Sequence, residues 1–150
     1  MSLIIAGGTT TLISFIGKDI ILKTINQSCS SIIILLNYLI YDCNNFYEIK
    51  QKLELLDINN KISVINLIIE ENIEKYSDKK SINLVFNSIK EILEQLNNEL
   101  SGLKNKIEDN KQLYFSYFRK INLNTEIKSI ENHNNILDKR FDLLIKSIKI

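Results

Sequence analysis

The sequence predicts an all-α protein that folds as an antiparallel four- or five-helix bundle with two long C-terminal helices. The 150 residues include no proline, so the residue that most often ends a helix is missing and long helices are permitted. Apolar residues recur at steps of three and four through most of the chain, which is the spacing of one helix face. Hydrophobic residues make up 45% of the sequence, enough to fill a single core. We therefore expect one domain, residues 1–150.

The first helix is predicted over residues 9–41, either continuous or broken between residues 26 and 31. The string from Ser31 to Ile34 would suit a strand, but no second segment offers the alternating pattern of a partner strand. Residues 1–40 carry only three charges, at Lys18, Asp19 and Lys23. This helix could be buried at the centre of the bundle, which we favour, or it could present a face to a membrane or a protein partner. Residues 24–41 are uncharged, but their Asn, Gln and hydroxyl residues make them weak as a membrane-spanning segment.

Two shorter helices are predicted next. Residues 45–56 form the first of them, and a second begins after Asp57, a residue type suited to the N-cap. Its apolar face consists of Ile58, Ile62, Ile65 and Ile69.

A long amphipathic helix is predicted over residues 81–110, with Ser81 or Asp78 capping its start. Gly102 interrupts the pattern without breaking it, which indicates a bend or a close helix contact. The apolar face of this helix consists of Ile82, Val85, Ile89, Ile92, Leu96, Leu103 and Ile107.

The last helix is predicted over residues 124–149. Every seventh residue is apolar along one seam, and a neighbouring seam completes the same face. Asn134 is the polar position in that second seam, and we expect it to form a solvated or register-setting polar layer. The first seam consists of Leu123, Ile130, Leu137 and Leu144, and the second of Ile127, Phe141 and Ile148.

The composition argues against most chemistry. One His, two Cys and four scattered Gly cannot build a zinc finger or a glycine-rich phosphate loop. His133 lacks a second ligand at helical spacing, and Asp19 is expected to be solvated or paired with lysine. The hydroxyl residues around Cys29 have no nearby His to activate them. We therefore predict no enzyme, with no catalytic residue, no metal site and no cofactor.

The most distinctive stretch is residues 112–121, where four aromatic residues lie beside two basic ones. Tyr114 and Tyr117 are predicted to face outward next to Arg119 and Lys120, and these four are candidate interaction residues. Such a stretch can stack on nucleic acid, but packing at the end of the bundle is favoured, and a net charge of +1 makes nucleic acid an unlikely partner. The other arginine, Arg140, has Asp138 and Asp142 as candidate partners.

The 29 Ile, 19 Asn and 17 Lys, against one Ala and two Arg, follow A/T-rich codons. This bias indicates an A/T-rich genome, such as that of a large DNA virus, a protist or a reduced bacterium. No basic leader precedes the apolar start, so we expect a cytoplasmic protein, in the host cytoplasm or virion if it is viral, with a membrane-peripheral location as the alternative. Cys29 and Cys43 are then reduced, and the sequon at Asn26 is unused.

The chain opens with a glycine-containing apolar segment, Ile4 to Gly17, and ends in a Leu-Asp-Lys-Arg-Phe-Asp-Leu-Leu helix, Leu137 to Leu144. In outline it resembles the HeLo and MLKL-type four-helix bundles, which act in membrane-directed cell death. The resemblance rests on this pattern and includes no diagnostic motif. It implies that residues 3–17 contact lipid or a partner, in particular Leu3, Ile4, Ile5, Leu12, Ile13, Phe15 and Ile16.

The function predicted from the sequence is protein–protein interaction or assembly by a non-enzymatic helical bundle, which binds a protein partner or itself. Two alternatives stay open: a bundle that associates with or perturbs membranes, and weak nucleic-acid binding through the basic C-terminal quarter.

Overall fold

The computed structural model describes residues 6–42, 47–111 and 122–149, with side chains from Gly17 onward. α1 (Ala6–Asn37) continues into a π-helical turn, η1 (Tyr38–Asp42). Four further helices follow: α2 (Tyr47–Leu56), α3 (Ile58–Asn72), α4 (Lys80–Lys111) and α5 (Asn124–Lys149). No strand occurs within these ranges. The predicted all-α bundle is confirmed, and the bounds of α4 and α5 agree with the sequence pattern to within one residue.

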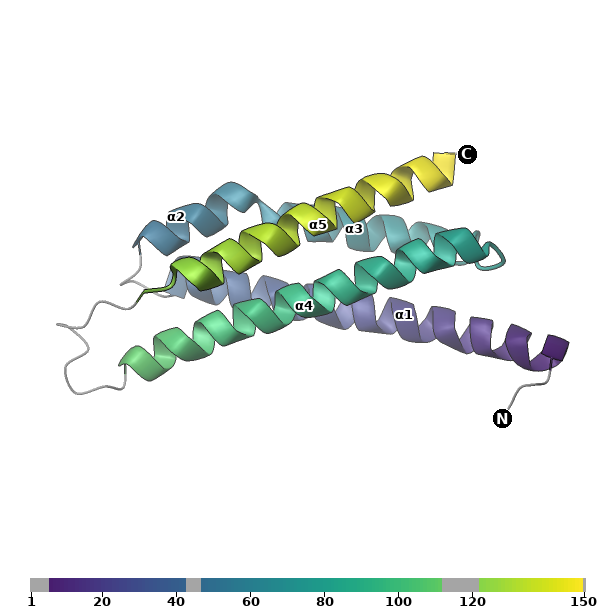
Figure 1. The fold of residues 1–150 in the computed structure, drawn as a ribbon, viewed down its shortest axis with the longest axis horizontal. Helices are drawn as coiled ribbons and strands as arrows, with labels where there is room; N and C mark the ends of the chain where they lie inside the picture. The colour runs from purple at the N-terminus through teal and green to yellow at the C-terminus, as the bar shows by residue number, and fades with distance from the viewer. Residues whose placement is uncertain (1–5, 43–46, 112–121, 150) are drawn as a thin grey trace.

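The helices form an elongated bundle in which α4 packs against both α1 and α5 (Figure 1). α5 runs antiparallel to α4, since Lys106 of α4 pairs with Glu126 at the start of α5 and Ser88 contacts Arg140 near its end. α1 runs parallel to α4. Lys104, near the C-terminal end of α4, lies over the ring of Tyr38, which directly follows the C-terminal end of α1. α2 and α3 together form one column that returns antiparallel to α1 (Figure 1). The architecture is thus a four-helix bundle with one column split in two.

The split occurs at Asp57, whose backbone is left-handed, with φ 50 and ψ 39. A non-glycine residue adopts this conformation at a cost of roughly 1–2 kcal/mol, and it interrupts the helical backbone, so that α2 ends and α3 begins within the same column. Asp57 occupies the predicted N-cap position of α3, but its side chain makes no capping hydrogen bond. Its carboxylate instead accepts a hydrogen bond of 2.9 Å from the Asn60 amide. The position was therefore predicted correctly and the capping role was wrong.

The apolar faces predicted for α3, α4 and α5 form the core. All the apolar positions predicted for α3 and α4 are buried. In α5, Ile127 and the seam of residues spaced seven apart are buried, and Phe141 and Ile148 are partly buried against the core. Phe86 is the largest fully buried side chain. Full burial of an apolar side chain of this kind stabilises the fold by about 1.5–3 kcal/mol. These residues form a core because they recur on one face of each helix, and not because the residue is Ile rather than Leu.

Two details predicted for α4 are wrong: the cap at Ser81 and the close helix contact at Gly102, whose alternative, a bend, stays a prediction. Ser81 is the second residue of the helix and not its cap, because α4 begins at Lys80 and the Lys79 carbonyl accepts the Asn83 amide. Gly102 is exposed, and a Cβ added there would meet nothing within 4 Å. Its neighbours therefore do not require a glycine, and no close helix contact occurs at this residue.

Arg140 does not pair as the sequence suggested. Its guanidinium donates to the Ser88 carbonyl of α4, and Asp138 instead pairs with Lys61 of α3 at 2.7 Å. Both predicted carboxylate partners lie on the same helix as Arg140, whereas the observed acceptor lies on the neighbouring helix. The arginine thus joins α5 to α4.

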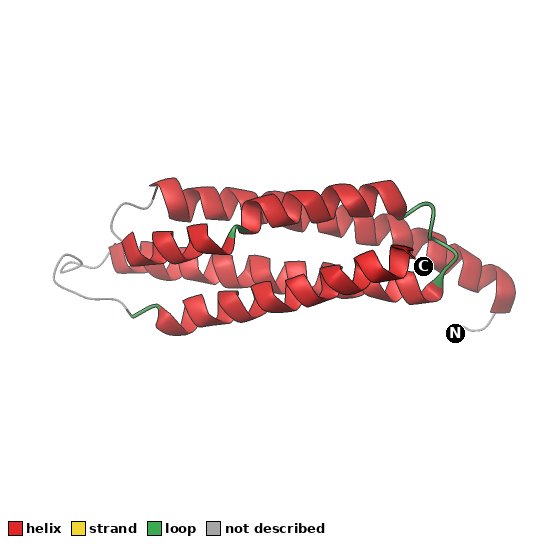
Figure 2. Ribbon diagram, turned by 90° about the horizontal axis from the view of Figure 1, so that it is seen from above, coloured by secondary structure: helices red, strands yellow, loops and turns green. Residues whose placement is uncertain are grey.

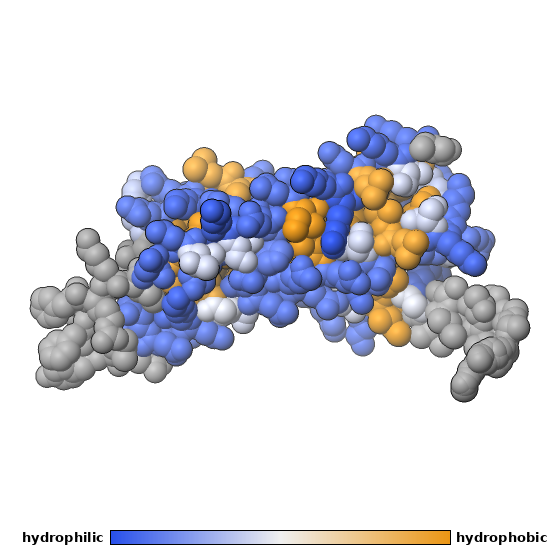
Figure 3. All heavy atoms as spheres, in the orientation of Figure 1, coloured by the Kyte–Doolittle hydropathy of each residue, from blue (hydrophilic) through white to orange (hydrophobic). Residues whose placement is uncertain are grey.

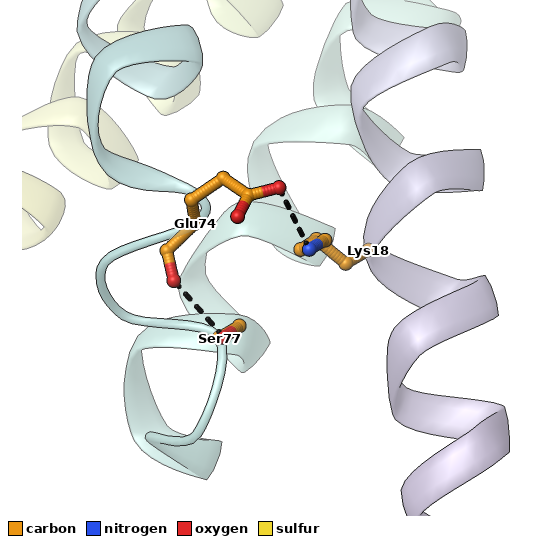
Figure 4. Close-up of polar contacts among 3 residues, drawn as sticks. All are labelled: Lys18, Glu74 and Ser77. Atoms are coloured by element: carbon orange, nitrogen blue, oxygen red, sulfur yellow. Dashed lines mark hydrogen bonds and ion pairs between the residues drawn. The ribbon is translucent and has the colours of Figure 1, made fainter.

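Lys18 of α1 joins that helix to the end of the α3 column. Its side chain is 7% exposed, and its ammonium donates to the Glu74 carboxylate at 3.0 Å (Figure 4). The Glu74 carbonyl accepts the Ser77 hydroxyl at 3.0 Å, which orders the turn before α4 (Figure 4). Asp19, next in the chain, is exposed, in agreement with the solvated role predicted for it.

Candidate interaction surface

The residues predicted to bind partners are only partly covered by the structure. Tyr114, Tyr117, Arg119 and Lys120 lie outside the described residues, and so do Leu3, Ile4 and Ile5. The backbone positions of Leu12, Ile13, Phe15 and Ile16 belong to α1, but their side chains are not among those described. The first turns of α1 extend past the ends of the neighbouring helices (Figure 2). The role predicted for these residues stays a prediction.

The described part of α1 carries a seam of outward-facing side chains that sequence reasoning missed. Ile20, Gln27, Ile34 and Tyr41 follow one another at seven-residue steps, and all four are exposed. The exposed fractions of Ile20, Ile34 and Tyr41 are 54%, 67% and 65%. Because seven residues make almost two α-helical turns, Ile20, Gln27 and Ile34 share one face of α1, and Tyr41 follows them in the π-helical turn η1. We call these four residues the outer seam.

A shallow groove lies in the middle of the outer seam. Its volume is about 490 Å³, and its lining consists of four polar and two apolar residues of α1. Gln27 and Ile34 of the outer seam form part of its wall. The complete lining is Asn26, Gln27, Ser30, Ser31, Ile34 and Leu35.

The opposite face of α1 forms part of the core. Its buried side chains are Ile25, Cys29, Ile32, Leu36 and Leu39, which recur at helical spacing. In η1, the adjacent residues Leu39 and Ile40 are both buried. α1 therefore has apolar side chains on two opposite faces, and the prediction that this segment is a buried central helix is wrong.

Two further properties set α1 apart. From Gly17 to Asp42 it has four charged residues, Lys18, Asp19, Lys23 and Asp42, with no net charge. This segment is long and apolar enough to cross a membrane, and only 28% of its most apolar window is buried. A core helix of a soluble bundle passes the same test of length and composition, but usually with most of its surface buried.

The α4–α5 face differs from α1. Polar side chains cover most of it, and apolar side chains appear in separate patches, the largest toward the C-terminal end of α5 (Figure 3). Leu84 and Leu143 are exposed there, each one turn from the contact between Ser88 and Arg140. Charged residues of α4 and α5 flank both leucines.

The described residues offer little chemistry. No group of three His, Cys, Asp or Glu side chains among them could hold a metal ion. Cys29 is a free, buried thiol that contacts the Ile62 carbonyl at 3.9 Å, and burial raises its pKa to about 12. It is therefore protonated at neutral pH and is not a nucleophile. His133 is half-buried, and its Nδ1 has no hydrogen-bond partner among the described residues. Cys43 lies outside them.

Comparisons with known proteins give one distant relative. An uncharacterized protein of Acanthamoeba polyphaga mimivirus is 27% identical over 153 aligned positions, which cover 83% of this chain and 71% of that protein. No family profile matches the sequence. No solved structure matches the fold. The similarity is compatible with a viral origin, one of the sources considered from the codon bias, and it indicates no activity.

Proposed function

We propose that this protein acts in protein–protein interaction or assembly, and that the outer seam of α1 is the surface it uses. The observation that carries the proposal is the seven-residue recurrence of Ile20, Gln27, Ile34 and Tyr41 on a face that no described helix covers. Exposed apolar side chains that share one helix face mark binding surfaces more often than scattered ones do. Seven-residue spacing is the pattern by which one helix packs along another.

The groove at Gln27 supports the same proposal. Helix-in-groove recognition uses apolar anchors one or two turns apart with polar groups between them, and this face provides both. Only four charged side chains lie along the 26 residues from Gly17 to Asp42, and one of them, Lys18, is already buried, so few charges leave water when this face is covered.

The test is sedimentation velocity of the full chain at increasing concentration, with the double variant Ile20→Glu with Ile34→Glu. The matched control is Val64→Glu with Leu67→Glu, which places the same two charges on exposed positions of α3. We expect the wild type and the control to gain mass with concentration and the α1 variant to stay monomeric. If all three remain monomers at the highest concentration, the protein does not assemble through this face.

A second function, membrane association, is supported by the length and exposure of Gly17–Asp42 and by the resemblance to HeLo and MLKL-type bundles. It predicts that the full chain floats with anionic liposomes and that Ile20→Glu with Ile34→Glu reduces the bound fraction. Liposomes that recover no wild-type protein would rule it out.

A further inference from the structure

The order of apolar and polar side chains along the outer seam indicates what kind of partner this surface can bind. Within the outer seam, Ile20 and Ile34 lie seven residues before and after Gln27, so these three positions read apolar, polar, apolar in both directions along the helix, and Tyr41 lies beyond this symmetric part. A face with this symmetry is complementary to itself when it is turned end to end. Isologous pairing of one patch with its own copy is the commonest way in which proteins form dimers.

We infer that the outer seam binds a second copy of this chain, with the two α1 helices antiparallel and the two-fold axis at Gln27. In this arrangement Ile20 of one copy packs against Ile34 of the other, and the two Gln27 side chains meet at the centre. A polar pair within an apolar seam fixes the register of paired helices, because a shifted register would bury each amide against an aliphatic side chain. This inference rests on the proposed function and specifies its partner.

The charges on α1 decide between antiparallel and parallel pairing. A parallel pair in register would place Lys23 beside Lys23 and Asp19 beside Asp19, and like charges at an interface oppose association. In the antiparallel pair, Lys23 falls opposite Ser31 of the second copy, with Ser30 close by. Those hydroxyl groups line the groove and can accept hydrogen bonds from an ammonium group.

The size of the seam predicts the strength of the pairing. From Ile20 to Tyr41 the helix spans roughly 33 Å, at 1.5 Å per residue. A strip of this length and about 10 Å wide is well below the ~800 Å² per partner of a standard stable interface. The dimer should therefore be weak and in equilibrium with monomer, with a dissociation constant of roughly micromolar to millimolar.

The test is disulfide trapping in full-length protein that carries Cys43→Ser, so that no second native thiol competes; Cys29 stays, because it is buried. Gln27→Cys should form a disulfide-linked dimer under mild oxidation. Ile20→Cys alone and Ile34→Cys alone should not, because each is offset from its own copy by 14 residues, or roughly 21 Å, and a disulfide needs Cα atoms within about 7 Å. A mixture of the two variants should give the linked heterodimer. Leu67→Cys, exposed on α3, is the control for random collision.

The outcomes separate this inference from the proposed function. Self-linked dimers of Ile20→Cys and of Ile34→Cys would show parallel pairing and overturn the antiparallel arrangement. If Gln27→Cys links no faster than Leu67→Cys while the wild type sediments as a dimer, another geometry is used; this overturns the inference and leaves assembly intact. A wild type that is monomeric throughout and binds only liposomes would overturn both in favour of a membrane surface.

Discussion

Lys61 of α3 donates a hydrogen bond of 2.9 Å to Asn134 of α5, and the same ammonium lies 2.7 Å from the Asp138 carboxylate. Asn134 is only 4% exposed, so its amide is the polar layer predicted within the apolar seam of α5. Asn134 and Asp138 are one turn apart, and a single lysine reaches both. The contact fixes the axial position of α3 relative to α5, and the polar layer is buried and not solvated.

Lys61→Met should destabilise the fold by about 1–3 kcal/mol, because it leaves the buried Asn134 oxygen without a donor. Asn134→Leu should be neutral or stabilising, since it continues the apolar seam and leaves Lys61 paired with Asp138. Urea denaturation followed by circular dichroism measures both changes. Lys90→Met is the control, because its partner Glu94 lies on the same helix surface and such pairs contribute about 0.3–0.5 kcal/mol. Equal losses for Lys61→Met and Lys90→Met would contradict this role for Lys61.

Gly102→Ala should stabilise the protein by about 0.5–1 kcal/mol. The residue is exposed within α4, a Cβ there meets nothing within 4 Å, and alanine loses less backbone entropy on folding. The midpoint of thermal unfolding should rise accordingly. A loss of stability in this variant would show that the glycine is needed for a bend or a contact after all.

The sequence predicted the helices well because their buried faces follow a single period. The positions of α3, α4 and α5 were correct for this reason: each has one apolar face, and the chain lacks the prolines that would end a helix early. Side-chain partners were predicted poorly, as Arg140 and Asp57 show. Which donor meets which acceptor depends on how neighbouring helices are aligned along their axes, and the spacing within one helix does not determine that alignment.

The orientation of α1 could not be deduced from the sequence. Ile25 and Ile32 are buried, whereas Ile20 and Ile34 are exposed, and all four are isoleucines in an almost uncharged segment. With apolar residues on two faces, helical periodicity cannot tell which face meets the core. The seven-residue spacing of Ile20, Gln27, Ile34 and Tyr41 was visible, but only the packing of α3 and α4 on the opposite face shows that this seam is the outer one.

Cys29 should resist thiol reagents in the native protein. Its pKa of about 12, well above the ordinary 9.0, results mainly from burial and secondarily from the nearby charge of Glu70. In a Cys43→Ser background, a colorimetric disulfide reagent at pH 8 should label Cys29 at the rate of unfolding and immediately in denaturant. Rapid labelling of the folded protein would contradict this.

The same shift in pKa predicts a dependence of stability on alkaline pH. The folded state keeps the thiol protonated more strongly than the unfolded state does. The stabilising contribution is therefore complete below about pH 9 and is lost as the pH rises from 9 toward 12. Compared with Cys29→Ala, the wild type should lose more stability over this range in urea titrations. Identical pH profiles above pH 9 would show that the thiol is not buried as described.

Glu126 should give the opposite dependence at acidic pH. A hydrogen bond from Lys106 lowers the pKa of its carboxyl, so the carboxylate stabilises the fold above the ordinary value of 4.5 and this contribution is lost as the pH falls through the folded-state pKa. Lys106 is 47% exposed, so solvent screens the pair and the effect should stay below about 1 kcal/mol.

Urea denaturation between pH 3 and pH 7 should show a smaller loss of stability on acidification for Glu126→Gln than for the wild type. Glu108→Gln, which removes the carboxylate of the 4.0 Å pair with Lys104 within α4, is the matched control. A Glu126→Gln profile that coincides with the wild type would mean that the contact between α4 and α5 at this end of the bundle does not persist in solution.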